Sequence, residues 1–232
     1  MKLLALDTSS DACSVALQLD NTISETHVVE PKQHTRLLIP MIRDSLHDAG
    51  VQLQDLDAII LGNGPGSFIG MRIAASVAQG LAFGSGLKIV PVSSMAAVAA
   101  EVMETYSAAE VIVAQDARMN EAYLGIYRDD GKGIPTAVTD EVLQPIEKID
   151  LLAAANVSVL FAAGQAWEKY PALLELNRAA IAEIVDVRYP KARYLLGLGT
   201  RAWQAGEAIA PENLAPAYIR TKVAEKPRTS DS

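Results

Sequence analysis

Apolar and polar positions alternate through the first 29 residues in the pattern of antiparallel strands. Cys13, Val15 and Leu17 fall on one face of the second strand, and Asp20 with Asn21 has the composition of a hairpin turn. Three strands are therefore predicted, at residues 2–7, 13–19 and 22–29.

From residue 34 onward the apolar spacing changes to that of helices separated by short buried strands. Helices are expected at residues 34–49 and 70–83, and each is apolar over a wide arc of its surface. Because one sheet cannot cover both sides of such a helix, we expect another chain to bury part of this surface. The alternative is an ordinary core filled by alanine. The remaining elements here are strands at 58–61 and 88–92 and a helix that Ser93 or Ser94 caps and that runs to about Tyr106.

A similar order of elements begins again near Val111. A shift of 109 residues places Asp7 on Asp116 and Asp20 on Asp129, with a strand before the first aspartate of each pair and a hairpin arm after it. We interpret this pattern as an internal repeat. The later elements are expected to be helices at 146–155, 165–177 and 191–205 and strands at 158–162 and 184–187.

Composition and charge exclude several classes of protein. The chain of 232 residues has 20 Lys plus Arg and 28 Asp plus Glu, so its net charge is −8. This acidic balance argues against a protein that binds nucleic acid without a partner. No apolar run approaches the roughly 18 residues of a membrane helix, and the start is too short for a signal peptide. The single cysteine, Cys13, and three unpaired histidines favour neither a disulfide nor a metal site, so the reducing cytoplasm is expected.

Two acidic residues are the first candidates for chemistry. Asp7 and Asp116 each follow a predicted strand, and carboxylates at such strand ends face the phosphate and metal of a two-lobed phosphotransferase. The alternative, which the pattern leaves equally open, is that both side chains cap turns.

The glycine-rich segment from Gly62 to Gly70 is the second candidate. It matches neither phosphate-binding signature, so a tight structural turn is favoured over an anion cradle at the following helix. Ser67 does not lie in a nucleophile elbow, and the predicted strand points Cys13 inward. Hydrolytic catalysis therefore has little support.

Five segments of the chain carry a distinctive combination of motifs. The segments are residues 2–16, His34-Thr35, Gly64-Pro65-Gly66-Ser67-Phe68-Ile69-Gly70-Met71-Arg72, Gln115-Asp116-Ala117-Arg118-Met119 and Pro216-Ala217-Tyr218-Ile219-Arg220. Taken together they resemble the TsaB family, also called YeaZ, whose bacterial members are the non-catalytic partners in tRNA threonylcarbamoyladenosine synthesis. The resemblance runs from residue 1 to about 220.

The resemblance implies an α/β fold of the actin-like type, with two lobes built from a duplicated mixed sheet flanked by helices, as in acetate and sugar kinases, Hsp70 and other ribonuclease H-like proteins. This agrees with the repeat found above. The bounds expected are 1–106 for an N-terminal lobe with the partner-binding helices, 107–190 for a smaller lobe, 191–220 for a C-terminal helix and extension that packs back on the lobes, and 221–232 for a flexible tail.

The resemblance also implies a larger catalytic paralogue, TsaD, which holds a metal through an HxxxH pair. Here Ser94 and Val98 stand at the two ligand positions, and neither can replace an imidazole. Ile69 stands where the family usually has Thr, and residues 161–165 match the superfamily's adenosine loop only in part. No catalytic residue, metal or cofactor is therefore expected. What remains is a degenerate pocket of Asp7, Thr8, Ser9, Asp116 and Arg118.

In this family the two early helices pair with those of TsaD, or with a second copy of the chain when TsaD is absent. The resemblance thus implies a scaffold that supports TsaD, with the ATPase TsaE joining them. The tRNA would be reached through the complex, and no membrane is involved. The acidic surface leaves a minor contact through Lys222, Lys226 and Arg228 open. The residues expected to contact the partner are Leu37, Leu38, Met41, Ile42, Ile73, Val77 and Leu81.

Two other functions stay open. One is an independent ATPase or phosphotransferase that uses Asp7 and Asp116. The other is a peptidase, which has the least chemical support because the sequence offers neither a metal pair nor a nucleophile elbow.

Overall fold

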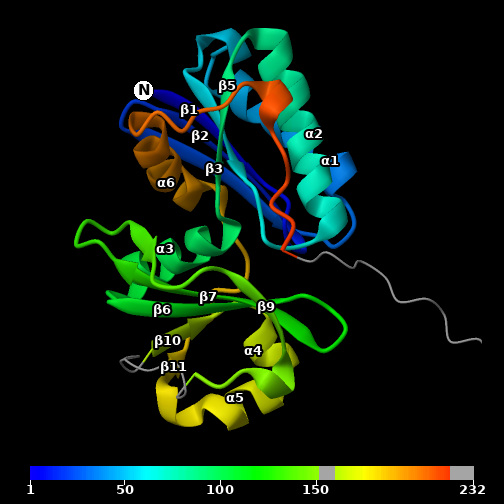
Figure 1. Ribbon diagram of the computed structural model, residues 1–232. Coiled ribbons are helices and arrows are strands. Elements are labelled where there is room, and N and C mark those ends of the chain that lie inside the picture. The colour runs from blue at the N-terminus through cyan, green and yellow to red at the C-terminus, as the bar shows by residue number, and fades with distance from the viewer. Residues whose placement is uncertain (152–159, 220–232) are drawn as a thin grey trace, which may run out of the picture.

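The computed structural model describes residues 1–151 and 160–219, which form two mixed sheets (Figure 1). The first sheet has the order β3-β2-β1-β4-β5 and the second the order β8-β7-β6-β10-β11, with β9 also pairing β7. The first sheet contains β1 (Lys2–Asp7), β2 (Ala12–Leu19), β3 (Thr22–Val29), β4 (Ala58–Gly62) and β5 (Lys88–Val92). The second contains β6 (Glu110–Asp116), β7 (Glu121–Asp129), β8 (Pro135–Ala137), β9 (Val142–Pro145), β10 (Leu160–Ala163) and β11 (Ile181–Ile184).

The two sheets repeat one topology. In each, three strands pair antiparallel, and two further strands then add in parallel on the far side of the central strand, β1 or β6. The two central strands end in Asp7 and Asp116, as the 109-residue shift predicts. The expected fold class, a two-lobed actin-like α/β protein with a duplicated sheet, is therefore confirmed.

Helices form three layers around the sheets. α1 and α2 cover one face of the first sheet, while α6 covers its other face and touches α3 (Figure 1). α3 follows β5 of the first sheet but packs on the second sheet, whose far face is covered by α4 and α5. The helices are α1 (His34–Asp48), α2 (Phe68–Ser85), α3 (Ser94–Tyr106), α4 (Ala166–Lys169), α5 (Pro171–Asn177) and α6 (Ala192–Gln204).

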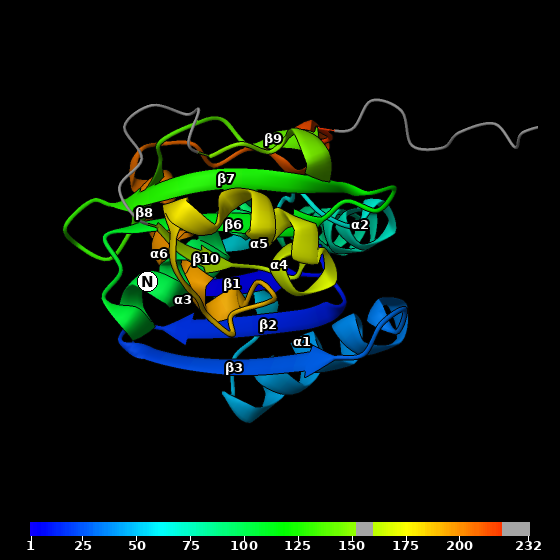
Figure 2. The same cartoon turned by 90° about the horizontal axis from the view of Figure 1, so that it is seen from below.

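Strand alternation divides the first lobe into two cores. Leu4 and Leu6 of β1 point toward α1 and α2, whereas Leu3 and Ala5 point toward α6. Both faces of β1 are therefore buried, whereas β3, which lies at the edge of the sheet, carries several polar and exposed residues (Figure 2).

The predictions for the first half of the chain are confirmed to within two residues at nearly every element, including helices α1 and α3. In the second half, three were wrong. In the described part of the helix expected at 146–155, Ile146–Lys148 form a 3-10 turn and residues 149–151 are not helical, and β11 begins three residues before the expected strand. The helix at 165–177 is two helices, because Pro171 cannot donate a backbone hydrogen bond and Tyr170 before it is not helical.

Parts of some predictions fall outside the described residues, among them the tail at 221–232 and the ends of the elements predicted around 155–158. The predicted lobe bounds stay predictions, since α3 and α6 each follow one sheet and pack on the other. In the described part of the chain, no helix is both long and apolar enough to cross a membrane.

Candidate functional site

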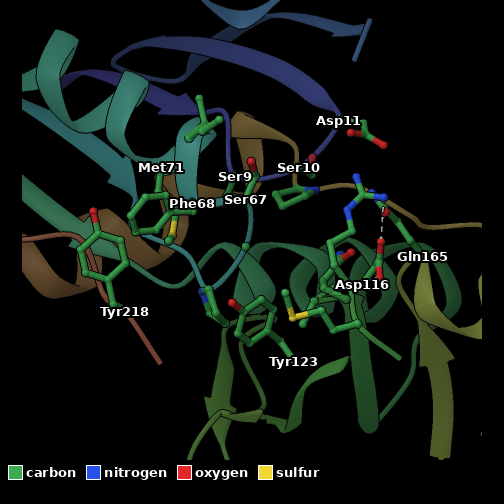
Figure 3. A pocket seen from close by; sticks show the side chains of 18 residues that line it. Ser9, Ser10, Asp11, Ser67, Phe68, Met71, Asp116, Tyr123, Gln165 and Tyr218 are labelled. Carbon is green, nitrogen blue, oxygen red and sulfur yellow. Dashed lines mark hydrogen bonds and ion pairs between the residues drawn. The ribbon is translucent and has the colours of Figure 1, made fainter. Parts of the chain in front are cut away.

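A cleft of about 370 Å³ lies between the two lobes. Figure 3 shows Ser9 and Ser67 on the side of the first lobe, with Asp116 and Tyr123 on the side of the second. Its lining is formed by Ser9, Ser10, Asp11, Pro65, Gly66, Ser67, Phe68, Ile69, Met71, Gln115, Asp116, Ala117, Arg118, Met119, Tyr123, Gln165, Pro190 and Tyr218.

Asp7 does not reach this cleft, which corrects its expected place in the pocket. Its side chain is 1% exposed, and Ser94 Oγ donates a hydrogen bond of 2.6 Å to Oδ2. The backbone N–H and the hydroxyl of Ser9 both donate to Oδ1 at 2.8 Å. Burial raises the pKa of Asp7 to about 6, although the hydrogen bonds from Ser94 and Ser9 act in the opposite direction. The carboxyl group is thus a buried structural contact that joins β1 to α3.

Thr8 is also structural rather than part of the pocket. Its hydroxyl donates to the carbonyl oxygen of Gly70 at 2.7 Å, and its side chain is fully buried. A Cβ at Gly70 would lie 1.9 Å from the carbonyl oxygen of Thr8, and one at Gly66 would lie 2.2 Å from that of Ser9. The glycine-rich loop therefore packs directly on the β1–β2 turn, as the structural interpretation of this segment predicts.

Asp116 occupies the equivalent strand end in the second lobe and does line the cleft. Tyr170 donates a hydrogen bond of 2.7 Å to it, and Lys169 and Arg118 form ion pairs with it. Burial alone would raise the pKa of Asp116, but the hydrogen bonds from Lys169 and Tyr170 outweigh burial and lower it. The carboxylate is thus ionised and already has two cationic partners.

Arg118 belongs to the turn that opens toward the cleft. Arg118, Met119 and Asn120 all have positive φ, at 64°, 54° and 57°. A positive φ at a residue other than glycine costs on the order of 1 kcal/mol of conformational free energy. Backbone strain of this kind is concentrated at functional positions in proteins. The turn presents the guanidinium of Arg118 and the half-exposed Met119 to the other lobe.

The candidate residues do not assemble into a site with paired carboxylates, a metal ion or an activated nucleophile. Asp7 and Asp116 are not presented together, since only Asp116 lines the cleft. The described residues contain no group of three or more histidine, cysteine or acidic side chains that could hold a metal ion. Ser94 and Val98, at the positions of the paralogue's metal ligands, are fully buried. Burial raises the pKa of the Cys13 thiol to about 12, so it is no nucleophile.

A second hollow, of about 390 Å³, lies between α1 and α2, and we call it the helical groove. Ile39 and Ile69 beside it are 59% and 70% exposed, which is unusual for isoleucine and marks a surface suited to an apolar partner. The helical groove is lined by His34, Thr35, Leu38, Ile39, Ile69, Arg72, Ile73, Ser76 and Val77.

The residues expected to contact a partner divide into two groups. Leu37, Ile73, Val77 and Leu81 are half-buried and remain candidates. Leu38, Met41 and Ile42 are instead buried in the chain's own core, because their i, i+3, i+4 spacing turns them toward the sheet; Leu38 alone also contributes to the floor of the helical groove. The expectation for Met41 and Ile42 as surface residues was wrong.

Sequence analysis missed a cluster at the start of α2. Arg72 lies with its guanidinium carbon 3.7 Å from the centre of the Phe68 ring, and its Nε donates to the Tyr218 hydroxyl at 2.7 Å. All three residues lie in segments that carry the family resemblance, but no spacing rule joins positions 146 residues apart.

Comparisons with known proteins agree with the fold and with the motifs. A family model described as TsaD, tRNA N6-adenosine threonylcarbamoyltransferase, matches residues 21–227. The tRNA threonylcarbamoyladenosine biosynthesis protein TsaB of Escherichia coli (strain K12) is 35% identical over 97% of both chains, and that of Haemophilus influenzae is 34% identical over 97% of this chain and 96% of its own. A solved structure of YeaZ from Pseudomonas aeruginosa is 37% identical, with a TM-score of 0.86 over 94% of this chain and 99% of that one. Since the similarity to these relatives spans nearly the whole length and the same fold, the chain belongs to the TsaB family.

Proposed function

We propose that this chain acts in tRNA threonylcarbamoyladenosine biosynthesis as a supporting subunit with no catalytic residue of its own. The relatives that it matches over nearly their full length carry this pathway in their names. The observation that carries the proposal is the helical groove, where Ile39 and Ile69 are left exposed beside apolar walls.

The proposed partner is the catalytic paralogue TsaD, which docks on α1 and α2. An apolar groove between two helices accepts an amphipathic helix, and burial of exposed isoleucines supplies free energy for the association. By binding only the competent arrangement of its partner, such a subunit raises the population of that arrangement. The chain thereby contributes to the reaction without touching the substrate.

The other parts of the proposal follow from this role. TsaE joins the pair, the tRNA is bound by the complex rather than by this acidic chain alone, and the assembly works in the cytoplasm. In the absence of TsaD, a second copy of the chain occupies the same groove.

The alternative of an independent phosphotransferase has less support. It needs both Asp7 and Asp116 at the reacting phosphate, yet Asp7 is 1% exposed and bonded to Ser94, and Asp116 is already paired with Lys169. A peptidase would need a metal or an activated nucleophile, and the buried Cys13 thiol is neither.

The proposal is tested by mixing the purified chain with TsaD and measuring the dissociation constant by calorimetry. Ile39→Asp places a charge in the helical groove and is expected to weaken the complex by about 100-fold, because a buried unpaired charge costs several kcal/mol. Ile184→Asp, at a 40% exposed isoleucine on β11 of the second lobe, is the matched control and should bind normally. The same variants are then compared for threonylcarbamoyl transfer to tRNA in the reconstituted system. A wild-type chain that does not bind TsaD, or that modifies tRNA alone, would contradict the proposal.

A further inference from the structure

One charged side chain stands in the otherwise uncharged lining of the helical groove. Among the described residues that line it, Arg72 carries the one permanent charge, and the walls beside it are Ile39, Ile73 and Val77. A cation among apolar side chains loses hydration when a partner covers it, so its presence affects which partner can bind. Arg72 therefore makes the groove selective.

The guanidinium of Arg72 is held in place before any partner binds. It lies over the Phe68 ring at 3.7 Å and near the Tyr218 ring at 5.5 Å, and the Tyr218 hydroxyl accepts a hydrogen bond from Nε. Figure 3 shows Phe68 and Tyr218 side by side. Their ring centroids are 5.3 Å apart. Because these contacts fix the long side chain, little rotamer entropy remains to be lost on binding.

Arg72 has no carboxylate partner among the described residues, and only its Nε is in a described hydrogen bond. The terminal nitrogens of a guanidinium form a fork that matches a carboxylate in two parallel hydrogen bonds. Five of the other arginines that the structure describes form ion pairs, whereas Arg36, Arg178 and Arg193 are, like Arg72, in none of the described ion pairs. The five are Arg43, Arg118, Arg128, Arg188 and Arg201.

From these contacts we infer that Arg72 determines the specificity of the helical groove, and that its occupant is a partner helix carrying an aspartate or glutamate that pairs with Arg72 alongside apolar residues for the walls. This inference rests on the proposed function, since it names the chemistry of the partner at the same groove. A second copy that met this one groove to groove would bring a second Arg72 and no carboxylate from the groove lining, so an acidic helix of a different chain is the favoured occupant.

The experiment compares Arg72→Leu and Arg72→Lys with the wild-type chain in binding to TsaD, at low and high salt. Arg72→Leu replaces the cation with a shorter, apolar side chain, so a purely apolar groove would bind as well or better. The inference instead expects about 30-fold weaker binding and loss of most of the salt dependence, with Arg72→Lys in between because it keeps the charge and loses the fork. Lys148→Leu, at an exposed lysine of the second lobe, removes the same charge and should change neither quantity.

Three results separate this inference from the proposed function. If the wild-type chain does not bind TsaD, the proposed function is wrong, and the inference about Arg72, which rests on it, is wrong with it. If the wild-type chain binds and Arg72→Leu binds equally well at both salt concentrations, only the acidic-helix inference is overturned. If sedimentation shows that Arg72→Leu loses self-association and keeps its affinity for TsaD, the carboxylate belongs to a second copy, and the inference is again wrong. Thermal unfolding of each variant, expected to match the wild-type chain because Arg72 is exposed, confirms that the fold is intact.

Discussion

Replacing Asp7 by asparagine tests whether this residue is a buried structural contact or a reactive carboxylate. Burial raises the pKa of Asp7 from its ordinary 3.8 to about 6 in the folded chain. As the pH rises, the unfolded chain loses this proton first, so the folded state loses stability between about pH 4 and pH 6. A pKa difference of this size corresponds to about 3 kcal/mol. Asp7→Asn cannot ionise and should lack that dependence.

The assay is urea unfolding of both proteins, followed by circular dichroism at several pH values from about 4 to 7.5. The free energy of unfolding of the wild-type chain, taken relative to Asp7→Asn, should rise by about 3 kcal/mol as the pH falls across this range. Asp116→Asn is the matched control from the repeat. Its folded pKa is lowered below the ordinary 3.8, so the advantage of the wild-type chain over Asp116→Asn should be nearly constant above about pH 5 and should shrink as the pH falls toward and below 3.8, which requires this series to be extended below pH 4.

Opposite responses at these two related positions would support the structural role of Asp7. A difference between the wild-type chain and Asp7→Asn that is the same at every pH would refute the reasoning, because it would mean that the carboxyl group has an ordinary pKa and reaches solvent. Loss of an activity of the isolated chain in Asp7→Asn, with stability unchanged, would favour the phosphotransferase instead.

Two further predictions concern packing. Gly70→Ala should lower the free energy of unfolding in urea by about 2–4 kcal/mol, because its Cβ would lie 1.9 Å from the Thr8 carbonyl oxygen. Gly84→Ala on the same helix meets nothing within 4 Å and should stabilise the chain by about 0.5 kcal/mol. Equal effects of the two substitutions would contradict the close approach at Gly70. Cys13, buried and with its pKa raised to about 12, should not react with a thiol reagent at pH 8 until urea is added, and rapid reaction in the folded chain would show that β2 opens.

Local pattern was sufficient for much of the fold. The alternation along residues 12–19 and the turn at Asp20, which has a φ of 54°, predict the first hairpin correctly. α1 ends within one residue of the predicted 49, and Gly50, with a φ of 65°, follows its C-cap. The two strands that end in aspartate were also found, because the repeat preserves their place before a hairpin. These features depend on neighbours within a few residues.

Long-range packing could not be predicted in the same way. Asp7 is buried because Ser94, 87 residues later, fills the space beside it, and no spacing rule indicates that contact. Likewise, the periodicity of α1 shows an apolar arc without dividing it into the part that faces the sheet, such as Met41, and the part that stays exposed, such as Ile39. The sequence therefore predicts the two helices that form the helical groove, but it does not predict which of their side chains line its surface.

The crossing of α3 and α6 has a consequence for how the molecule can be divided. α3 shields the second sheet and α6 shields the first, so a cut between the lobes would strip an apolar face from each half. Neither half would then be stable as an independent fragment, and the two lobes should unfold together in a single cooperative transition. In the proposed complex, a contact at α2 would thus be linked through the packed sheets and helices to the opposite lobe.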